Sequence, residues 1–357
     1  MSDNLDPLEP EAAMDLYLDT RRGELRPKTF RSQRYRLTAF VRWCRAEGIT
    51  NMNDVDGRTL HAFRVARRDG FEDYDQHYMD DYAEVGQQTL YNHLSTLRVF
   101  LRFVSKVDAV PESLPSKIIL PTVSEDEQVS DTTLDPARAD SILHYLDRYH
   151  YASRKHVILL LLWHTGCRAG GIRALDLEDV DLDGTHPRVD GPAVNFVHRP
   201  ETDTPLKNGE RGERWNGISE YVAEVLHDYI NGPRNDIEDS YGRDPLLTTR
   251  QGRPRVSTIR NTMYAITRPC WYGEECPHDR EIDSCEAAPY KMATKCPSSR
   301  SPHDARSGSL TRYLLQDTPR DVVQDRMNVS DKVLDRHYDR RTLREKMEQR
   351  RKYLPDQ

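Results

Sequence analysis

The segment Ser301-Pro302-His303-Asp304-Ala305-Arg306, close to the end of this 357-residue chain, carries most of the information about its fold. Ser301 is a preferred helix N-cap and Pro302 a preferred first helical residue, so the segment predicts the start of a helix. Asp304 would lie in the first turn, where a carboxylate interacts favourably with the helix dipole. His303 and Arg306 are three residues apart and would therefore share one face.

A histidine beside an arginine suits phosphate chemistry, and Tyr338 follows the arginine by 32 residues. A guanidinium binds two phosphate oxygens, an imidazole moves a proton near neutral pH, and a phenol can act as a nucleophile. Alone, the His-x-x-Arg pattern is a weak signal, because most such pairs are ordinary surface residues. The sequence upstream gives it weight.

A second arginine, Arg168, lies upstream, directly after a predicted buried helix. The apolar run Val157–Trp163 predicts a buried helix that ends at Gly166, and Arg168 follows directly. Strands are predicted over 193–198 and around 214–218. Between them lies Lys207, the only lysine between positions 155 and 291, which could protonate a leaving oxygen.

This order of arginine, hairpin lysine, His-x-x-Arg and tyrosine resembles that of the tyrosine recombinases, the phage-integrase and Xer-like family. The resemblance covers nearly the whole chain. It implies a mainly α fold with a small β-sheet, in which a helical core-binding domain precedes an α+β catalytic domain. The positions that match the family's catalytic residues are Arg168, Lys207, His303, Arg306 and Tyr338.

Two positions depart from the family pattern. Gly171 stands where the family usually has an acidic residue, three positions after the first arginine. Where the family usually has Gly-His or Gly-Trp, some nine residues before the tyrosine, this chain reads Arg326-Met327-Asn328-Val329. Asn328 could donate a hydrogen bond to a phosphate but could not transfer a proton, and it completes the candidate catalytic set.

The resemblance implies a site-specific recombinase or integrase that acts on double-stranded DNA as a homo-tetramer on two sites. Tyr338 would form a 3′-phosphotyrosine bond, Lys207 would protonate the leaving oxygen, and the two arginines would bind the phosphate. The covalent link conserves bond energy, so catalysis requires no cofactor. Tyr313 and Tyr353 are competing tyrosines.

Two other functions stay open. A catalytically weakened member of the family could act as an architectural DNA-binding protein, as Gly171 and Asn328 suggest. A helix-turn-helix regulator would also show two short helices, here predicted over 318–327 and 330–338.

The length predicts about two domains. We expect a helical DNA-binding domain over residues 9–106, a flexible linker over 107–133 and a catalytic domain over 134–354. The longest apolar run has seven residues and the N-terminus is polar, which predicts a cytoplasmic protein with no membrane segment and no signal peptide.

The net charge of −7 argues at first against a nucleic-acid partner. However, 42 Arg against 10 Lys and 37 Asp against 22 Glu resemble the composition of proteins from salt-loving archaea, so local charge is more informative than net charge.

Between positions 21 and 45 there are nine basic residues and one acid. A helix capped by Thr29 and running over 30–46 would place an arginine stripe opposite its apolar face, where it would be a solvated surface or bind DNA phosphates. The stripe includes Arg31, Arg34, Arg42 and Arg45.

The six cysteines fall into two groups. Cys44 and Cys167 lie in or beside apolar segments and are predicted to be buried thiols. The other four lie in an insertion over 270–296, which has few core residues and would need a metal ion or a cross-link to hold one conformation. They are Cys270, Cys276, Cys285 and Cys296. They are candidate ligands of a structural zinc ion, with His278 as an alternative ligand. The absence of a Cys-x-x-Cys pair leaves unbound thiols and disulfides as alternatives.

Overall fold

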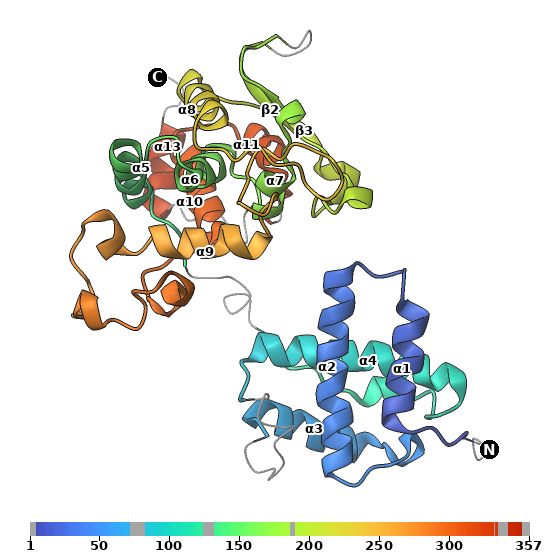
Figure 1. Cartoon of the computed structure of the whole chain (residues 1–357). Helices are drawn as coiled ribbons and strands as arrows, with labels where there is room; N and C mark the ends of the chain where they lie inside the picture. The colour runs from blue at the N-terminus through green and yellow to red at the C-terminus, as the bar shows by residue number, and fades with distance from the viewer. Residues whose placement is uncertain are drawn as a thin grey trace, which may run out of the picture. The chain divides into compact units, whose positions relative to one another are not determined.

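The computed structural model describes residues 5–71, 83–123, 132–185, 190–331, 333–334 and 342–351. The chain forms two compact units, Met1–Val129 and Ser130–Gln357 (Figure 1). Each unit has its own hydrophobic core, and none of the core clusters formed by the described residues includes side chains from both units. No helix in the described ranges is long and apolar enough to cross a membrane.

The described residues of the N-terminal unit form mainly the helices α1 (Pro10–Arg21), α2 (Pro27–Ala46), α3 (Gly57–Asp69) and α4 (Gln87–Val104). The apolar face of α4 is buried throughout, from Leu90 to Val104. Helix α2 begins earlier than expected, because Pro27 occupies its first turn, where the missing N–H costs nothing. Thr29 therefore lies inside the helix and is not its cap, so that prediction is wrong.

The core of the N-terminal unit extends beyond α4. Ala109, Val110, Leu114 and Ile118 are buried in the same cluster as the α4 side chains. The first part of the predicted linker over 107–133 is thus packed against the helical unit. These residues lie in short turns, such as η4 (Leu114–Lys117), and have no helical or strand periodicity that would have indicated burial.

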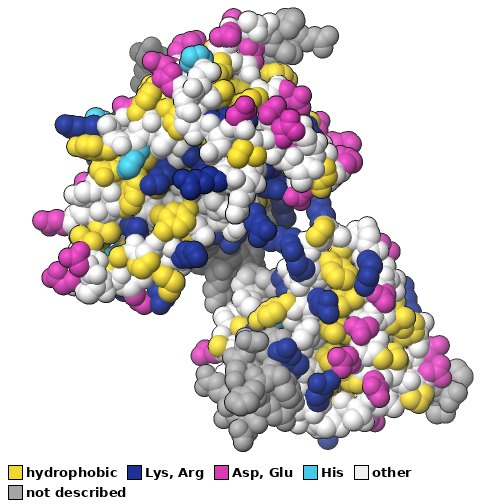
Figure 2. All heavy atoms as spheres, in the orientation of Figure 1, with side chains coloured by type: hydrophobic (Ala, Val, Ile, Leu, Met, Phe, Trp, Pro, Cys, Tyr) yellow, Lys and Arg dark blue, Asp and Glu magenta, His cyan; other side chains and the backbone are white. Residues whose placement is uncertain are grey.

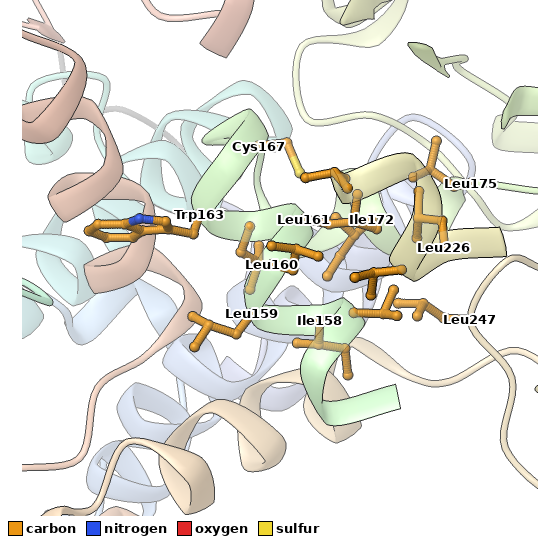
Figure 3. Close-up of a cluster of buried hydrophobic side chains, with 14 of the residues drawn as sticks. Ile158, Leu159, Leu160, Leu161, Trp163, Cys167, Ile172, Leu175, Leu226 and Leu247 are labelled. Carbon is orange, nitrogen blue, oxygen red and sulfur yellow. The ribbon is translucent and has the colours of Figure 1, made fainter. Parts of the chain in front are cut away.

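The C-terminal unit surrounds α6 (Arg154–Thr165), in which every residue from His156 to Trp163 is buried. Figure 3 shows side chains of α6 meeting Ile172, Leu226 and Leu247 from other elements. The other helices are α5 (Pro136–His150), α7 (Ala169–Ala174), α8 (Glu220–Asn231), α9 (Val256–Ile266), α10 (Pro302–Leu315), α11 (Arg320–Met327) and α13 (Leu343–Arg351).

A three-stranded antiparallel sheet of order β1-β2-β3 lies in the same unit. Its strands are β1 (Val180–Asp181), β2 (Ala193–Phe196) and β3 (Arg214–Gly217), and Phe196 pairs with Arg214 at the end that carries the β2–β3 connection. The two predicted strands and the mainly helical fold are confirmed.

Next to the sheet, three arginines and three aspartates form what we call the Arg–Asp network. Arg199 contacts Asp179 at 2.7 Å, Arg243 contacts Asp239 at 3.0 Å, and Arg253 contacts Asp239 at 2.8 Å. Asp176 is buried and forms ion pairs with all three arginines. The network joins the chain after α7 to the β2–β3 connection and to the segment before α9.

Candidate active site

The turn after α6 fixes the position of Arg168. Helix α6 ends at Gly166, which has a left-handed backbone (φ 59°) and donates its N–H to the carbonyl of Leu162 at 3.0 Å. A Cβ on Gly166 would lie 2.5 Å from Sδ of the buried Met327, so a side chain here would force the end of α11 to shift. Arg168 follows as the half-buried N-cap of α7.

The start of α10 fixes Arg306. Ser301 accepts the N–H groups of His303 and Asp304, and the carboxylate of Asp304 accepts the N–H of Ser301 at 2.7 Å. This is the capping box of a well-defined helix start. It confirms the helix start predicted from the sequence.

The guanidinium of Arg306 reaches the turn that carries Arg168. Arg306 is buried, and its Nη1 donates to the carbonyl of Gly166 at 2.6 Å and to that of Met327 at 2.7 Å. Gly166 is two residues from Arg168, so the structure brings together two of the predicted arginines, which are 138 residues apart in the sequence.

Asn328 links the β2–β3 connection to the turn where Arg306 meets Gly166. It follows α11 with a left-handed backbone (φ 49°), and its amide donates to the carbonyl of Arg211 at 2.5 Å and accepts from the amide of Asn208. Its own carbonyl lies 3.5 Å from Nη2 of Arg306. Lys207, which is exposed, precedes Asn208 in this connection. In this arrangement the side chain of Asn328 holds the lysine-bearing turn.

Two further arginines lie at this site, and sequence reasoning missed both. Arg214 donates from Nε to the carbonyl of Arg326 at 2.8 Å, and its guanidinium carbon lies 4.4 Å from the ring centroid of Phe196. Arg326 donates to the carbonyls of Gly217 and His164 at 3.0 and 3.1 Å. Arg214 comes from an ordinary strand position that no motif marks, and Arg326 was noted only as part of the segment that departs from the family pattern. We call Arg168, Arg214, Arg306 and Arg326 the arginine cluster.

The arginine cluster concentrates positive charge. Burial, together with the charges of Arg306, Arg168 and Arg326, lowers the pKa of Arg214 to about 10. Within the described ranges, no carboxylate forms a hydrogen bond or ion pair with Arg214 or Arg326. Partly buried cations of this kind favour a bound anion.

Gly171 faces the ring on which Arg214 rests. A Cβ at this position would lie 3.4 Å from ring carbons of Phe196, at an ordinary van der Waals distance.

The remaining predicted catalytic residues are placed as follows. His303 is exposed in the first turn of α10. Tyr338 and Tyr353 lie outside the described residues. The competing Tyr313 donates its hydroxyl to the carbonyl of His164 at 2.7 Å, and Arg326 lies over its ring at 5.5 Å. Tyr313 therefore has a packing role in this arrangement.

The predicted arginine stripe lies on α2, opposite the buried side chains of Leu37, Phe40 and Cys44. Arg31, Arg34 and Arg45 are exposed and Arg42 is half-buried. Arg45 forms an exposed ion pair with Glu11 at 2.7 Å. Figure 2 shows basic side chains on the visible face of this unit, with acidic ones among them.

The cysteines also divide as predicted. Cys44 and Cys167 are buried. The other four are half-buried and line one pocket in the segment between α9 and α10: Cys270, Cys276, Cys285 and Cys296.

No protein-family model and no curated protein matches the chain. Among solved structures, the Tn1549 transposon integrase in complex with transposon right-end DNA is 15% identical, with a TM-score of 0.63, over 97% of this chain and 99% of that chain. A lambda integrase dimer bound to a COC′ core site is 14% identical, with a TM-score of 0.61, over 95% of this chain and 79% of that chain.

The N-terminal domain of a phage integrase/site-specific recombinase from Haloarcula marismortui is 30% identical over 32% of this chain and 99% of that domain. Its TM-score is 0.28, so the fold assignment rests on the two longer matches. The chain has the fold of the tyrosine recombinases and integrases, as its motifs predict.

Proposed function

We propose that this protein is a site-specific recombinase or integrase that cuts and rejoins DNA through a 3′-phosphotyrosine intermediate. The observation that supports this most is the convergence of Arg168 and Arg306 on the Gly166 turn, within a cluster of four arginines. A scissile DNA phosphate is the anion that such a cluster would bind in a protein of this fold.

The arginines would bind the non-bridging oxygens of the phosphate. Forked guanidinium groups match pairs of phosphate oxygens, and preorganised cations stabilise the charge that develops in the transition state. The hydrogen bonds of Arg306 to two backbone carbonyls fix its guanidinium before substrate arrives. Arg214 would add charge from the β3 side.

Tyr338 would be the nucleophile, Lys207 the general acid and His303 an assistant in proton transfer or phosphate binding. The tyrosine hydroxyl would lose its proton with the assistance of His303 as its oxygen forms the bond to phosphorus. The bond from phosphorus to the 5′-oxygen breaks at the same time, and Lys207 protonates that oxygen. In rejoining, a 5′-hydroxyl attacks the phosphotyrosine and the tyrosine leaves. Asn328 would position the Lys207 turn through Asn208 and Arg211. No cofactor takes part in these steps.

The proposed partner is double-stranded DNA, bound by the arginine cluster and by the arginine stripe of α2. Lambda integrase has been solved as a tetramer bound to a Holliday junction. By analogy, we propose that this chain acts as a homo-tetramer on two DNA sites.

A nicked suicide substrate tests the reaction. The nick lies next to the cleavage position, so the released fragment diffuses away and the protein stays attached to the DNA. We expect an adduct that survives denaturing electrophoresis and disappears after protease treatment. Specific DNA binding without any adduct would instead identify an architectural DNA-binding protein of the same fold.

A further inference from the structure

The segment between α9 and α10, orange in Figure 1, has almost no hydrophobic core of its own. It contains three short 3-10 turns, η9 (Pro269–Tyr272), η10 (Ile282–Ser284) and η11 (Tyr290–Lys295). From 270 to 300, only Ala287 and Ala293 are buried. Two alanines cannot offset the conformational entropy of ordering such a segment, so another interaction must fix its shape.

The segment leaves and re-enters the unit at one point. The N–H of Arg300 donates to the hydroxyl of Thr267 at 2.7 Å, and Arg138 of α5 donates to the carbonyl of Ser298 at 2.7 Å. Because the two ends of the segment lie together, a bound ion could fix the conformation of its interior independently of the rest of the unit.

The interior contains four cysteines around one small pocket. The lining includes Cys270, Cys276, Cys285 and Cys296, and the cavity has a volume of ≈ 20 Å³. A space of this size holds one ion or one water molecule and excludes an organic ligand.

A buried arginine holds the Cys285 turn at this pocket. Arg268 donates to the carbonyls of Ala287 and Ala288, which directly follow Cys285 and Glu286 in the chain. Four thiolates beside one another would repel, and a divalent cation bound between them removes that repulsion.

We propose that Cys270, Cys276, Cys285 and Cys296 bind one structural zinc ion. Four thiolates in tetrahedral geometry are typical of structural zinc sites. Within the described ranges, no three metal-ligating side chains already have the spacing of a metal site, so the four sulfurs close on the ion by movement of the short turns. His278 is less suited because its Nε2 bonds to the hydroxyl of Ser298 at 2.9 Å.

The metal content of the full-length protein, expressed with zinc and purified without chelators, tests the proposal. We expect about one zinc per chain in the wild type and none in the double variant Cys276→Ser/Cys285→Ser. Cys44→Ala, which removes a buried thiol in the other unit, should keep the zinc. His278→Asn should keep it too, and loss there would overturn the four-cysteine assignment.

A second measurement does not depend on the folding of the variants. Wild-type protein, stripped by a chelator under reducing conditions, is titrated with Co²⁺. We expect thiolate-to-cobalt charge transfer and the strong visible bands of a tetrahedral site, which zinc then removes. Absence of these bands, iron in place of zinc, or a mass that rises by two hydrogens per pair on reduction would each overturn the proposal. DNA cleavage is not the readout, so these results are independent of the proposed function.

Discussion

Two groups of arginines in the C-terminal unit differ in what surrounds their charge. In the Arg–Asp network, the buried carboxylate of Asp176 pairs with three guanidinium groups, and Arg199 also contacts Asp179 at 2.7 Å. In the arginine cluster, the described hydrogen bonds of Arg214 and Arg326 go to backbone carbonyls.

The pKa values move in opposite directions for the same type of side chain. The hydrogen bond with Asp179 raises the pKa of Arg199, whereas burial and neighbouring arginines lower the pKa of Arg214 to about 10. A guanidinium that is neutralised by neighbouring carboxylates contributes to stability and needs no ligand. A guanidinium that is held by backbone carbonyls keeps its positive charge and is suited to bind an anion.

The largest expected effect concerns the nucleophile that would act at the arginine cluster. Tyr338→Phe removes one oxygen, so folding and DNA affinity should survive while covalent capture on the nicked substrate disappears completely. The matched control is Tyr313→Phe, which loses only the hydrogen bond to His164 and should still form the adduct. If Tyr338→Phe formed the adduct and Tyr313→Phe did not, the two tyrosines would have to exchange roles.

The second prediction compares one arginine from each group. Arg306→Lys keeps a charge but loses the fork that reaches two buried carbonyls. We expect adduct formation per folded molecule to slow by about 10²–10³-fold, with a smaller loss of stability of about 1–2 kcal/mol. Arg253→Ala removes one guanidinium partner of Asp176 and of Asp239, while Arg199 and Arg243 remain. We therefore expect the free energy of unfolding to fall by about 3 kcal/mol, the lower end of the range for breaking a buried pair.

Denaturant unfolding and adduct rates per folded molecule measure the two effects. We expect opposite patterns in the two variants. The Arg306 variant should lose mainly the rate of adduct formation, and the Arg253 variant should lose mainly stability against unfolding. Equal losses of rate in both variants would show that the Arg–Asp network also serves the reaction.

The third prediction concerns the general acid. Lys207→Ala should slow cleavage, and a substrate with sulfur in place of the 5′-bridging oxygen should restore the rate, because that leaving group needs no proton. The same substrate should not rescue Arg168→Ala, whose defect would be in binding the phosphate. Failure of the sulfur to rescue Lys207→Ala would remove the lysine from this role.

Local patterns were sufficient to predict the rigid parts of the site. The apolar run of α6, the glycine that ends it and the Ser301 cap each depend on neighbours in sequence, so the positions of Arg168 and Arg306 on their elements follow from local rules. The strands around Lys207 were predicted for the same reason.

What could not be predicted depends on contacts between distant segments. Arg214 joins the cluster because β3 pairs with β2 and α11 packs beside it, and Asn328 reaches Asn208 across 120 positions. Thr29 was mistaken for a cap because Pro27, two positions earlier, also starts a helix. Tyr338 lies outside the described residues, so its role remains a prediction from the sequence.

The smallest expected effect is a difference in how the stability of the Arg–Asp network and of the arginine cluster depends on pH. Burial alone would raise the pKa of Asp239, but hydrogen bonds from the N–H of Tyr241 and from Arg253 outweigh burial and leave it below its usual value. A lowered carboxyl pKa gives stability that is present above the unfolded value of about 4 and is lost as pH falls through the folded value. The stability difference between wild type and Asp239→Asn should therefore shrink below about pH 4. For Arg214→Gln the difference should stay constant over that range, because the partners of Arg214 are carbonyls and its own pKa is about 10. Thermal unfolding from pH 7 to 3 measures both differences, and parallel curves for the two variants would mean that the carboxylates do not distinguish the two groups.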